Sequence, residues 1–172
     1  MANSIFVFGQ PSLGLSNGQI SFPATQIPST DPNTLDDYVE FDWSPTIGGS
    51  GGQSGQVYSV QAGHGIKIGS FVQLHGRVQL STLGTITTSV QIQSLPYVVK
   101  NFDGNSFISC SIGAFTGFTT AIVWLSAIGT PGQSVLTLQK LTAAATAVAA
   151  CVQGDLSATS LIDFTAAYRT TN

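Results

Sequence analysis

The clearest pattern in the chain is an alternation of apolar and polar residues. Across residues 66–80 the even positions are mostly apolar, whereas the odd positions are mostly polar. A period of two places successive side chains on opposite faces of a β-strand, so we expect a pair of half-buried strands or one long bent strand here. In this register Lys67, His75 and Arg77 share the polar face.

The alternation returns several times along the rest of the chain. We expect further strands over residues 85–92, 106–115, 119–127, 134–140 and 160–169. In the last of these, the apolar face consists of Ile162, Phe164, Ala166 and Tyr168. The segment 141–152 is ambiguous, because its alanines favour a helix and its Thr and Val residues favour a strand. Short strands separated by turn dipeptides predict an all-β fold, an antiparallel β sandwich.

The first 42 residues lack this alternation. They contain four of the seven prolines and several isolated apolar side chains. We interpret residues 1–42 as an extended N-terminal arm that buries these side chains on another surface, and residues 43–172 as a β-sandwich knob domain. The alternative is an edge strand with loops of the same domain. The candidate anchoring residues are Phe6, Phe8, Leu13, Leu15, Ile20 and Phe22.

Composition narrows the function classes. Only 8% of residues are charged, against about 25% in a typical soluble domain. Hydrophobic residues make up 42% of the chain, which excludes disorder throughout. The net charge of −3 argues against nucleic acid as a partner. The longest apolar stretch is too short for a membrane helix, and the first residues lack the basic region of a secretory signal, so we expect no membrane partner.

Two local compositions suggest ligands but match no known loop. Five of the eight acidic residues fall within residues 31–42. We expect this run to be solvated; docking to a basic surface is the alternative, and the spacing does not match a calcium-binding loop. Residues 47–56 are rich in glycine but lack the lysine of a phosphate-binding loop. We therefore predict a flexible loop there and no nucleotide site.

Titratable nitrogens gather in one stretch, at His64, Lys67, His75 and Arg77. No carboxylate lies near them in sequence to orient a catalytic base. We therefore predict no catalytic residue, no enzyme activity, no metal site and no cofactor. We expect a hydrogen-bonding or interface role for this cluster, and His75 and Arg77 remain candidates for ligand or glycan contact. Asp163 is predicted to form a salt bridge with Arg77 or Arg169.

Aromatic residues and cysteines complete the list of candidates. The aromatic residues considered for a glycan-binding surface are Trp43, Tyr58, Tyr97, Phe115, Phe118 and Trp124. Phe115 and Phe118 are the strongest candidates, because Phe115-Thr116-Gly117-Phe118 is typical of a turn between two strands. Core packing is the alternative for both rings. Cys110 and Cys151 are expected to be free buried thiols, and their spacing leaves a disulfide open.

A series of motifs adds a resemblance to these patterns. The motifs are Asp42-Trp43-Ser44-Pro45-Thr46, Gly55-x-Val57-Tyr58-Ser59-Val60-Gln61-x-Gly63, Ile66-Lys67-Ile68-Gly69-x-x-Val72, Gly76-Arg77-Val78-x-Leu80-Ser81 and Leu161-Ile162-x-Phe164-x-Ala166-x-Tyr168. Together they resemble the small β domain of tailed-phage virion proteins, which occurs at tail-fibre tips and in capsid head-fibre or decoration proteins. The resemblance implies a jelly-roll-like β sandwich that forms a homotrimer in the virion.

Three functions remain to be compared. The first is a capsid decoration, or cement, protein that binds the major capsid protein or another virion protein through its arm. We place it on the capsid rather than the tail, because tail fibres carry long repetitive shafts and this chain has only a short arm. The second is a short tail-tip protein that recognises host surface glycan. The third, an integral outer-membrane protein or surface adhesin, is disfavoured by the missing signal.

Overall fold

The computed structural model describes residues 19–20, 29, 31, 34–35, 37–105 and 108–171. The described residues form twelve strands and one short 3₁₀ helix, η1 (Gln153–Asp155). The strands are β1 (Tyr38–Trp43), β2 (Thr46–Gly49), β3 (Gly52–Ser54), β4 (Val57–Ile68), β5 (Phe71–Thr82), β6 (Thr85–Thr87), β7 (Val90–Gln93), β8 (Ile108–Phe118), β9 (Ile122–Gly129), β10 (Leu136–Thr142), β11 (Ala149–Ala150) and β12 (Leu156–Arg169). The expected all-β antiparallel sandwich is confirmed. Within this part of the chain, no helix is long and apolar enough to cross a membrane.

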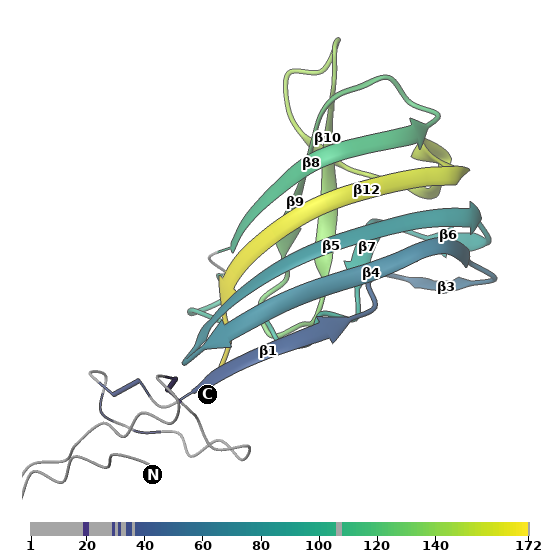
Figure 1. Cartoon of the computed structure of the whole chain (residues 1–172). Helices are drawn as coiled ribbons and strands as arrows, with labels where there is room; N and C mark the ends of the chain where they lie inside the picture. The colour runs from purple at the N-terminus through teal and green to yellow at the C-terminus, as the bar shows by residue number, and fades with distance from the viewer. Residues whose placement is uncertain are drawn as a thin grey trace, which may run out of the picture.

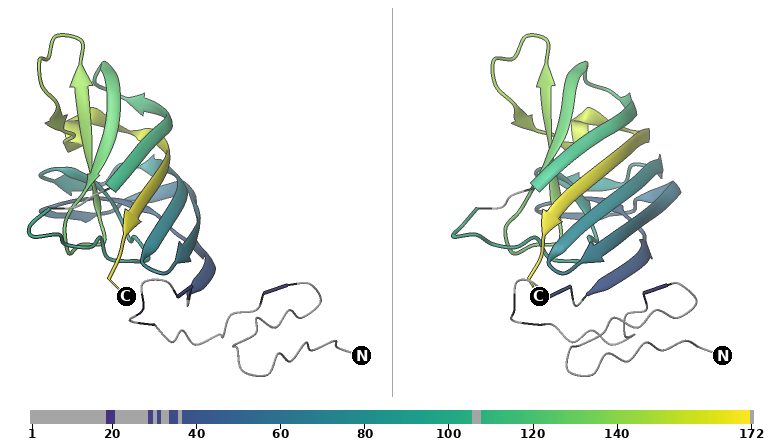
Figure 2. Two further views of the ribbon diagram at one scale, coloured as in Figure 1. Left: turned by 90° about the vertical axis from the view of Figure 1, so that its left-hand side faces the viewer. Right: turned by 60° about the vertical axis from the view of Figure 1, so that its left-hand side comes forward.

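Two antiparallel sheets form the layers of the sandwich. The larger has the order β1-β4-β5-β12-β8 and curves as one broad surface (Figure 1). In the other, β10 pairs with β9 along one side and with β7 and β11 along the other, and β7 pairs with β2. Strands β9 and β10 run steeply across the direction of the larger sheet (Figures 1 and 2). Strands β3 and β6 form a separate short ribbon.

The core lies between the two sheets and follows the predicted apolar faces. Strand β12 turns its even-numbered side chains inward, and Ile162, Phe164, Ala166 and Tyr168 are all buried. Strand β5 does the same with Val72, Leu74, Val78 and Leu80. The opposite layer contributes Ile47, Val90, Ile92, Leu136 and Leu138. Because alternate residues of each strand are buried, the other half of each long strand forms an outer face available for polar side chains.

The stretch 66–80 contains the end of one strand, a turn and most of the next strand. The side chains that face the core are odd-numbered before the turn and even-numbered after it. Strands β4 and β5 form a hairpin in which Ile68 lies opposite Phe71. Because two turn residues lie between the strands, β4 turns its odd-numbered side chains inward and β5 turns its even-numbered side chains inward. As a result Lys67 lies on the buried side, with 8% of its surface exposed. The prediction that Lys67 shares the polar face of His75 and Arg77 is wrong for this reason.

The glycine-rich stretch 47–56 is strand rather than flexible loop. Strands β2 and β3 occupy most of it and pair with β7 and β6. Gly49 lies against the backbone oxygens of Thr87 and Gly52, which leaves no room for a Cβ atom. The prediction of a flexible loop is wrong, because these glycines permit close packing of the backbone.

Two boundaries differ from the sequence analysis. The larger sheet begins at Tyr38, since all of β1 pairs with β4, so residues 38–42 belong to the sandwich. The ambiguous segment 141–152 contains the end of β10, a turn and the two-residue strand β11. Its alanines lie largely on the surface, so they add little to either sheet.

Candidate functional site

The outer face of the larger sheet carries a row of polar side chains, one from each strand. Asp42 of β1 lies opposite His64 of β4, and His64 lies opposite His75 of β5. His75 in turn lies opposite Thr165 of β12, which lies opposite Ser111 of β8. Partners directly opposite in an antiparallel sheet project from the same face and interact. We call these five residues the polar row.

Hydrogen bonds connect parts of the polar row. Nδ1 of His64 lies 2.5 Å from Oδ1 of Asp42, and both side chains are well exposed. Nδ1 of His75 lies 3.4 Å from Oγ1 of Thr165. Sequence reasoning found both histidines but missed the carboxylate, because Asp42 is brought to His64 only by the pairing of β1 with β4.

An ion pair lies beside the polar row. Arg77 donates from Nε to Oδ1 of Asp163 and from Nη2 to Oδ2, each at 2.5 Å. The hydrogen bond from Arg77 lowers the pKa of Asp163, and the same bond raises the pKa of Arg77. The predicted salt bridge of Asp163 is thereby confirmed with Arg77 as its partner. Two-point pairing fixes both side chains in one plane.

Two shallow hollows meet at the polar row. One, of about 330 Å³, is lined by Ala62, His64, His75, Gly76, Arg77, Gly113, Asp163, Phe164 and Thr165. The other, of about 400 Å³, is lined by Glu40, Phe41, Asp42, His64, Gly65, Ile66, Gln73 and His75. The two histidines belong to both. Imidazoles, a guanidinium–carboxylate pair and a hydroxyl can donate and accept hydrogen bonds to a polyhydroxylated ligand. No three His, Cys, Asp or Glu side chains gather as a metal site in the described part of the chain.

Aromatic packing supports this face from beneath. Gly63 and Gly76 lie opposite each other in the middle of β4 and β5. A Cβ atom on Gly63 would meet the indole of Trp43, and one on Gly76 would meet the ring of Phe164. The two rings pack edge to face, 6.1 Å apart. Glycine in mid-strand thus lets two large rings fill the inner face directly under the polar row.

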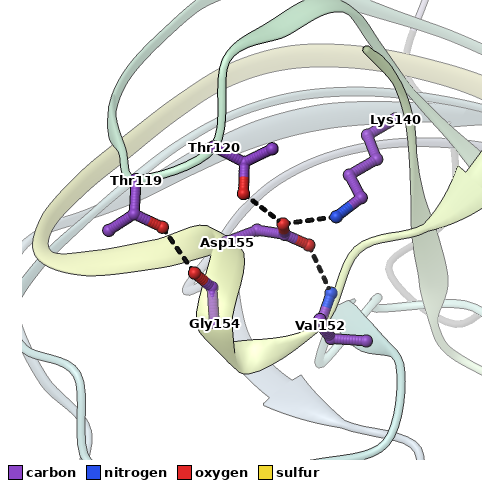
Figure 3. A network of polar contacts seen from close by, with 6 residues as sticks. All are labelled: Thr119, Thr120, Lys140, Val152, Gly154 and Asp155. Carbon is purple, nitrogen blue, oxygen red and sulfur yellow. Dashed lines mark hydrogen bonds and ion pairs between the residues drawn. The ribbon is translucent and has the colours of Figure 1, made fainter. Parts of the chain in front are cut away.

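A buried polar network lies away from this face, at η1 (Figure 3). Oδ1 of Asp155 accepts a hydrogen bond from Thr120 at 2.5 Å and pairs with Lys140, while Oδ2 accepts the N–H of Val152 at 2.8 Å. Burial alone would raise the pKa of Asp155, but the hydrogen bonds from Lys140, Thr120 and Val152 together hold this pKa below its ordinary value. The network ties β10 and the turn before β9 to η1.

A second buried lysine–aspartate pair joins Lys67 to Asp37. The two side chains are only 10% and 8% exposed. Oδ1 of Asp37 is buried and has no hydrogen-bond partner among the described residues. Nζ of Lys67 lies 5.7 Å from the centre of the Tyr97 ring. Part of the acidic run, predicted to be solvated, is therefore buried.

The other sequence candidates are placed as follows. Phe115 and Phe118 lie within β8, not in a turn, and the expectation of an exposed turn is wrong. Their rings pack edge to face at 5.6 Å and against the core, because a bulge in β8 turns Phe115 inward opposite Ile162. Ile20 is about half exposed. The other candidate anchoring residues, Phe6, Phe8, Leu13, Leu15 and Phe22, lie outside the described residues.

The cysteines are not bonded to each other. Cys110 and Cys151 are both free thiols. Burial raises the pKa of Cys110 to about 11 and that of Cys151 to about 12. Both thiols are therefore protonated and weakly nucleophilic at neutral pH.

Strand β9 presents an apolar patch of which the sequence analysis considered only Trp124. Val123, Trp124 and Ile128 are 59%, 48% and 53% exposed. In the described fold, β9 pairs as a strand with β10. Trp124 and Ile128 project from one face of the strand, and Val123, next to Trp124, projects from the other face at the start of the strand. We call these three side chains the β9 patch. Alternation alone could not reveal it, because the exposed positions of this strand are apolar as well.

Known proteins give no relative with which to compare these sites. Family models, curated proteins and solved structures each yield no match to the chain.

Proposed function

We propose that the chain is a structural protein of a tailed-phage virion, a capsid decoration or cement protein. In this proposal the segment before β1 binds the major capsid protein or another virion protein. The β sandwich is displayed on the capsid surface as the knob of a homotrimer. The role involves no catalytic step.

The observation that carries the proposal is the β9 patch on a sandwich with few charges. Trp124 and Ile128 lie on one face of an edge strand and Val123 lies at its start, each about half exposed. Only 8% of the chain is charged. Clustered apolar surface on a soluble domain typically marks a place where another protein binds, and interface centres are depleted in charge. A protein that works within an assembly accounts for both features.

The resemblance of the motifs to phage virion domains supports the same conclusion. The motif residues build the centre of the larger sheet: Trp43 and Phe164 pack under Gly63 and Gly76. They therefore specify a closely packed layer. A closely packed layer suits a protein whose task is to hold position on a shell.

Gold-labelled antibody against residues 43–172, applied to intact virions and viewed by electron microscopy, tests the location. Label spread over the head is the expected result. Label confined to the tail tip, or no label on particles that contain the chain, contradicts the proposal.

A binding assay tests the anchoring role. Added to undecorated capsids, the full chain should bind and raise the temperature at which the shells disrupt. A variant carrying Phe6→Ala and Phe8→Ala should bind more weakly. His75→Ala, on the outer face of the sandwich, is the matched control and should bind like the unchanged protein.

A second candidate function, a tail-tip protein that recognises host glycan, is favoured by the polar row. Beside the two hollows, Arg77 pairs with Asp163, and Asp42 contacts His64. Hydrogen-bonding groups of this kind suit a hydroxyl-rich ligand. Binding to a panel of bacterial surface glycans, lost in Arg77→Ala, together with label at the tail tip, would favour this function over decoration.

A further inference from the structure

The two buried lysine–aspartate pairs of the sandwich differ in how their carboxylates are satisfied. Asp155 receives hydrogen bonds from Thr120 and from the Val152 N–H in addition to its contact with Lys140. These bonds stabilise the carboxylate anion. Asp37 contacts Lys67 through Oδ2, while its Oδ1 is buried with no hydrogen-bond partner in the described part of the chain. An anion in the second setting is much less well stabilised.

The backbone holds Asp37 and Lys67 against each other. Val39 lies opposite Lys67 in the pairing of β1 with β4, and the Gly69 N–H donates to the backbone oxygen of Asp37 at 3.0 Å. Because both side chains project from the inner face of this strand pair, the Lys67 amine and the Asp37 carboxyl group meet in the interior. Intramolecular reactions between well-oriented groups reach effective concentrations of about 10⁵–10⁸ M.

The interior also favours the uncharged forms of the two groups. The side chains are 10% and 8% exposed, so water solvates neither charge well. Removing two charges from water is costly, and their attraction offsets this cost only when the remaining hydrogen-bonding positions are filled. Oδ1 of Asp37 is not filled in this way. Transfer of one proton from the ammonium to the carboxylate removes both charges and leaves an amine beside a carboxylic acid.

We propose that Lys67 and Asp37 condense to form an intramolecular isopeptide bond. The lone pair of the neutral Nζ attacks Cγ of Asp37 and forms a C–N bond. The C–O bond to one carboxyl oxygen then breaks, and that oxygen leaves as water with a proton from Nζ. The sum is one ammonium and one carboxylate converted to one amide and one water, with no oxidant or further reactant.

This bond ties the start of an edge strand to the next strand of the sheet. It closes the stretch from residue 37 to residue 67, so β1 cannot separate from β4 at its first residue. If the segment before β1 anchors the protein, as the proposed function holds, tension on that segment passes into β4 without loading the hydrogen bonds of β1. The bond itself does not depend on that function.

Mass spectrometry of the full-length chain tests the proposal directly. The folded protein should be lighter than its sequence mass by one water molecule, whereas Lys67→Arg and Asp37→Ala should have their full sequence masses. Comparison with these variants also accounts for any removal of Met1. Lys67→Arg keeps the positive charge but cannot form the amide, so it separates bond formation from charge pairing.

Trypsin digestion after denaturation locates the bond. Lys67 is the first basic residue of the chain and Arg77 the next. An unmodified Lys67 yields fragments 1–67 and 68–77, whereas the proposed bond blocks that cut and yields 1–77 lighter by one water. Lys140 is the internal control and should be cut normally, since Asp155 remains an ion-paired carboxylate. Full sequence mass in the folded protein, or cleavage after Lys67, would overturn the proposal. Neither result bears on where the protein lies in a virion, which the antibody experiment decides.

Discussion

Replacing Asp155 by alanine tests whether the buried network at η1 stabilises the sandwich. The Asp155 side chain is 4% exposed and its partner Lys140 17% exposed. Removing one member of a buried ion pair leaves the other charge without compensation, which costs about 3–5 kcal/mol. The N–H of Val152 and the hydroxyl of Thr120 also lose their acceptor. Since domains are typically stable by about 5–15 kcal/mol, we expect Asp155→Ala to remove a large part of the total.

Equilibrium unfolding in urea at neutral pH, followed by tryptophan fluorescence, measures this loss. The matched control is Asp163→Ala, which also removes a carboxylate from an ion pair. Arg77 is 56% exposed and Asp163 25% exposed, so water solvates the guanidinium that remains. The free energy of unfolding should therefore fall much less in the control. Equal losses in the two variants would refute the argument that burial sets the cost.

The pH dependence of the same network has a definite sign. Burial opposes ionisation of Asp155, but its three hydrogen bonds outweigh burial and place the pKa below the ordinary value of 3.8. The folded protein then binds this proton less readily than the unfolded chain. The contribution is complete above the ordinary pKa and is lost as the pH falls through the lower, folded pKa. The difference between the unchanged protein and Asp155→Ala should therefore narrow in strong acid, and a gap that widens there would contradict this reasoning.

Three further predictions follow from packing and burial. Gly76→Val should strongly destabilise the fold, because the new side chain meets the ring of Phe164; a melting temperature equal to that of the unchanged protein would contradict this. Trp124→Ser should weaken self-association in sedimentation equilibrium if the β9 patch lies between subunits, and an unchanged distribution of species would remove the patch from that interface. Cys110 and Cys151 should react with a thiol reagent slowly at neutral pH and rapidly after unfolding, since burial raises both pKa values; fast reaction in the folded protein would show that they are accessible.

Much of the fold is predictable from the chain because it depends on local alternation. The buried faces of β5 and β12 follow from a period of two that no turn interrupts, and both are observed. Where a turn lies within the pattern, the same reasoning fails. The two residues between β4 and β5 change the core-facing side chains from odd-numbered to even-numbered. Lys67 is therefore buried, although it is odd-numbered like the outward-facing His75 and Arg77. Alternation predicts which side chains share a face within one strand. It does not predict which face the residues beyond a turn occupy.

The candidate site is only half predictable for a related reason. The sequence identifies His75, Arg77 and Asp163 individually, and it predicts a salt bridge of Asp163 with Arg77 or Arg169. Their arrangement as part of a row depends on strand register, which brings residues together from five separate strands. Phe115 shows the limit most clearly. A bulge that no composition signal marks turns its ring toward the core, and a residue expected to contact ligand packs inside.

Two residues of the acidic run, Asp37 and Asp42, hold strand β1 against β4. Asp37, just before β1, contacts Lys67 on the inner face, and Asp42, near its end, contacts His64 on the outer face. An edge strand has hydrogen-bonding partners along one side only, so it is the strand most easily lost from a sheet. Two aspartates on opposite faces, near opposite ends, oppose both peeling from the first residue and rotation of the strand about its axis. The inner contact becomes the stronger of the two when the proposed bond between Asp37 and Lys67 forms, and it lies at the end where the preceding segment joins the sandwich. If that segment bears load in an assembly, the strand is held most firmly where the load enters.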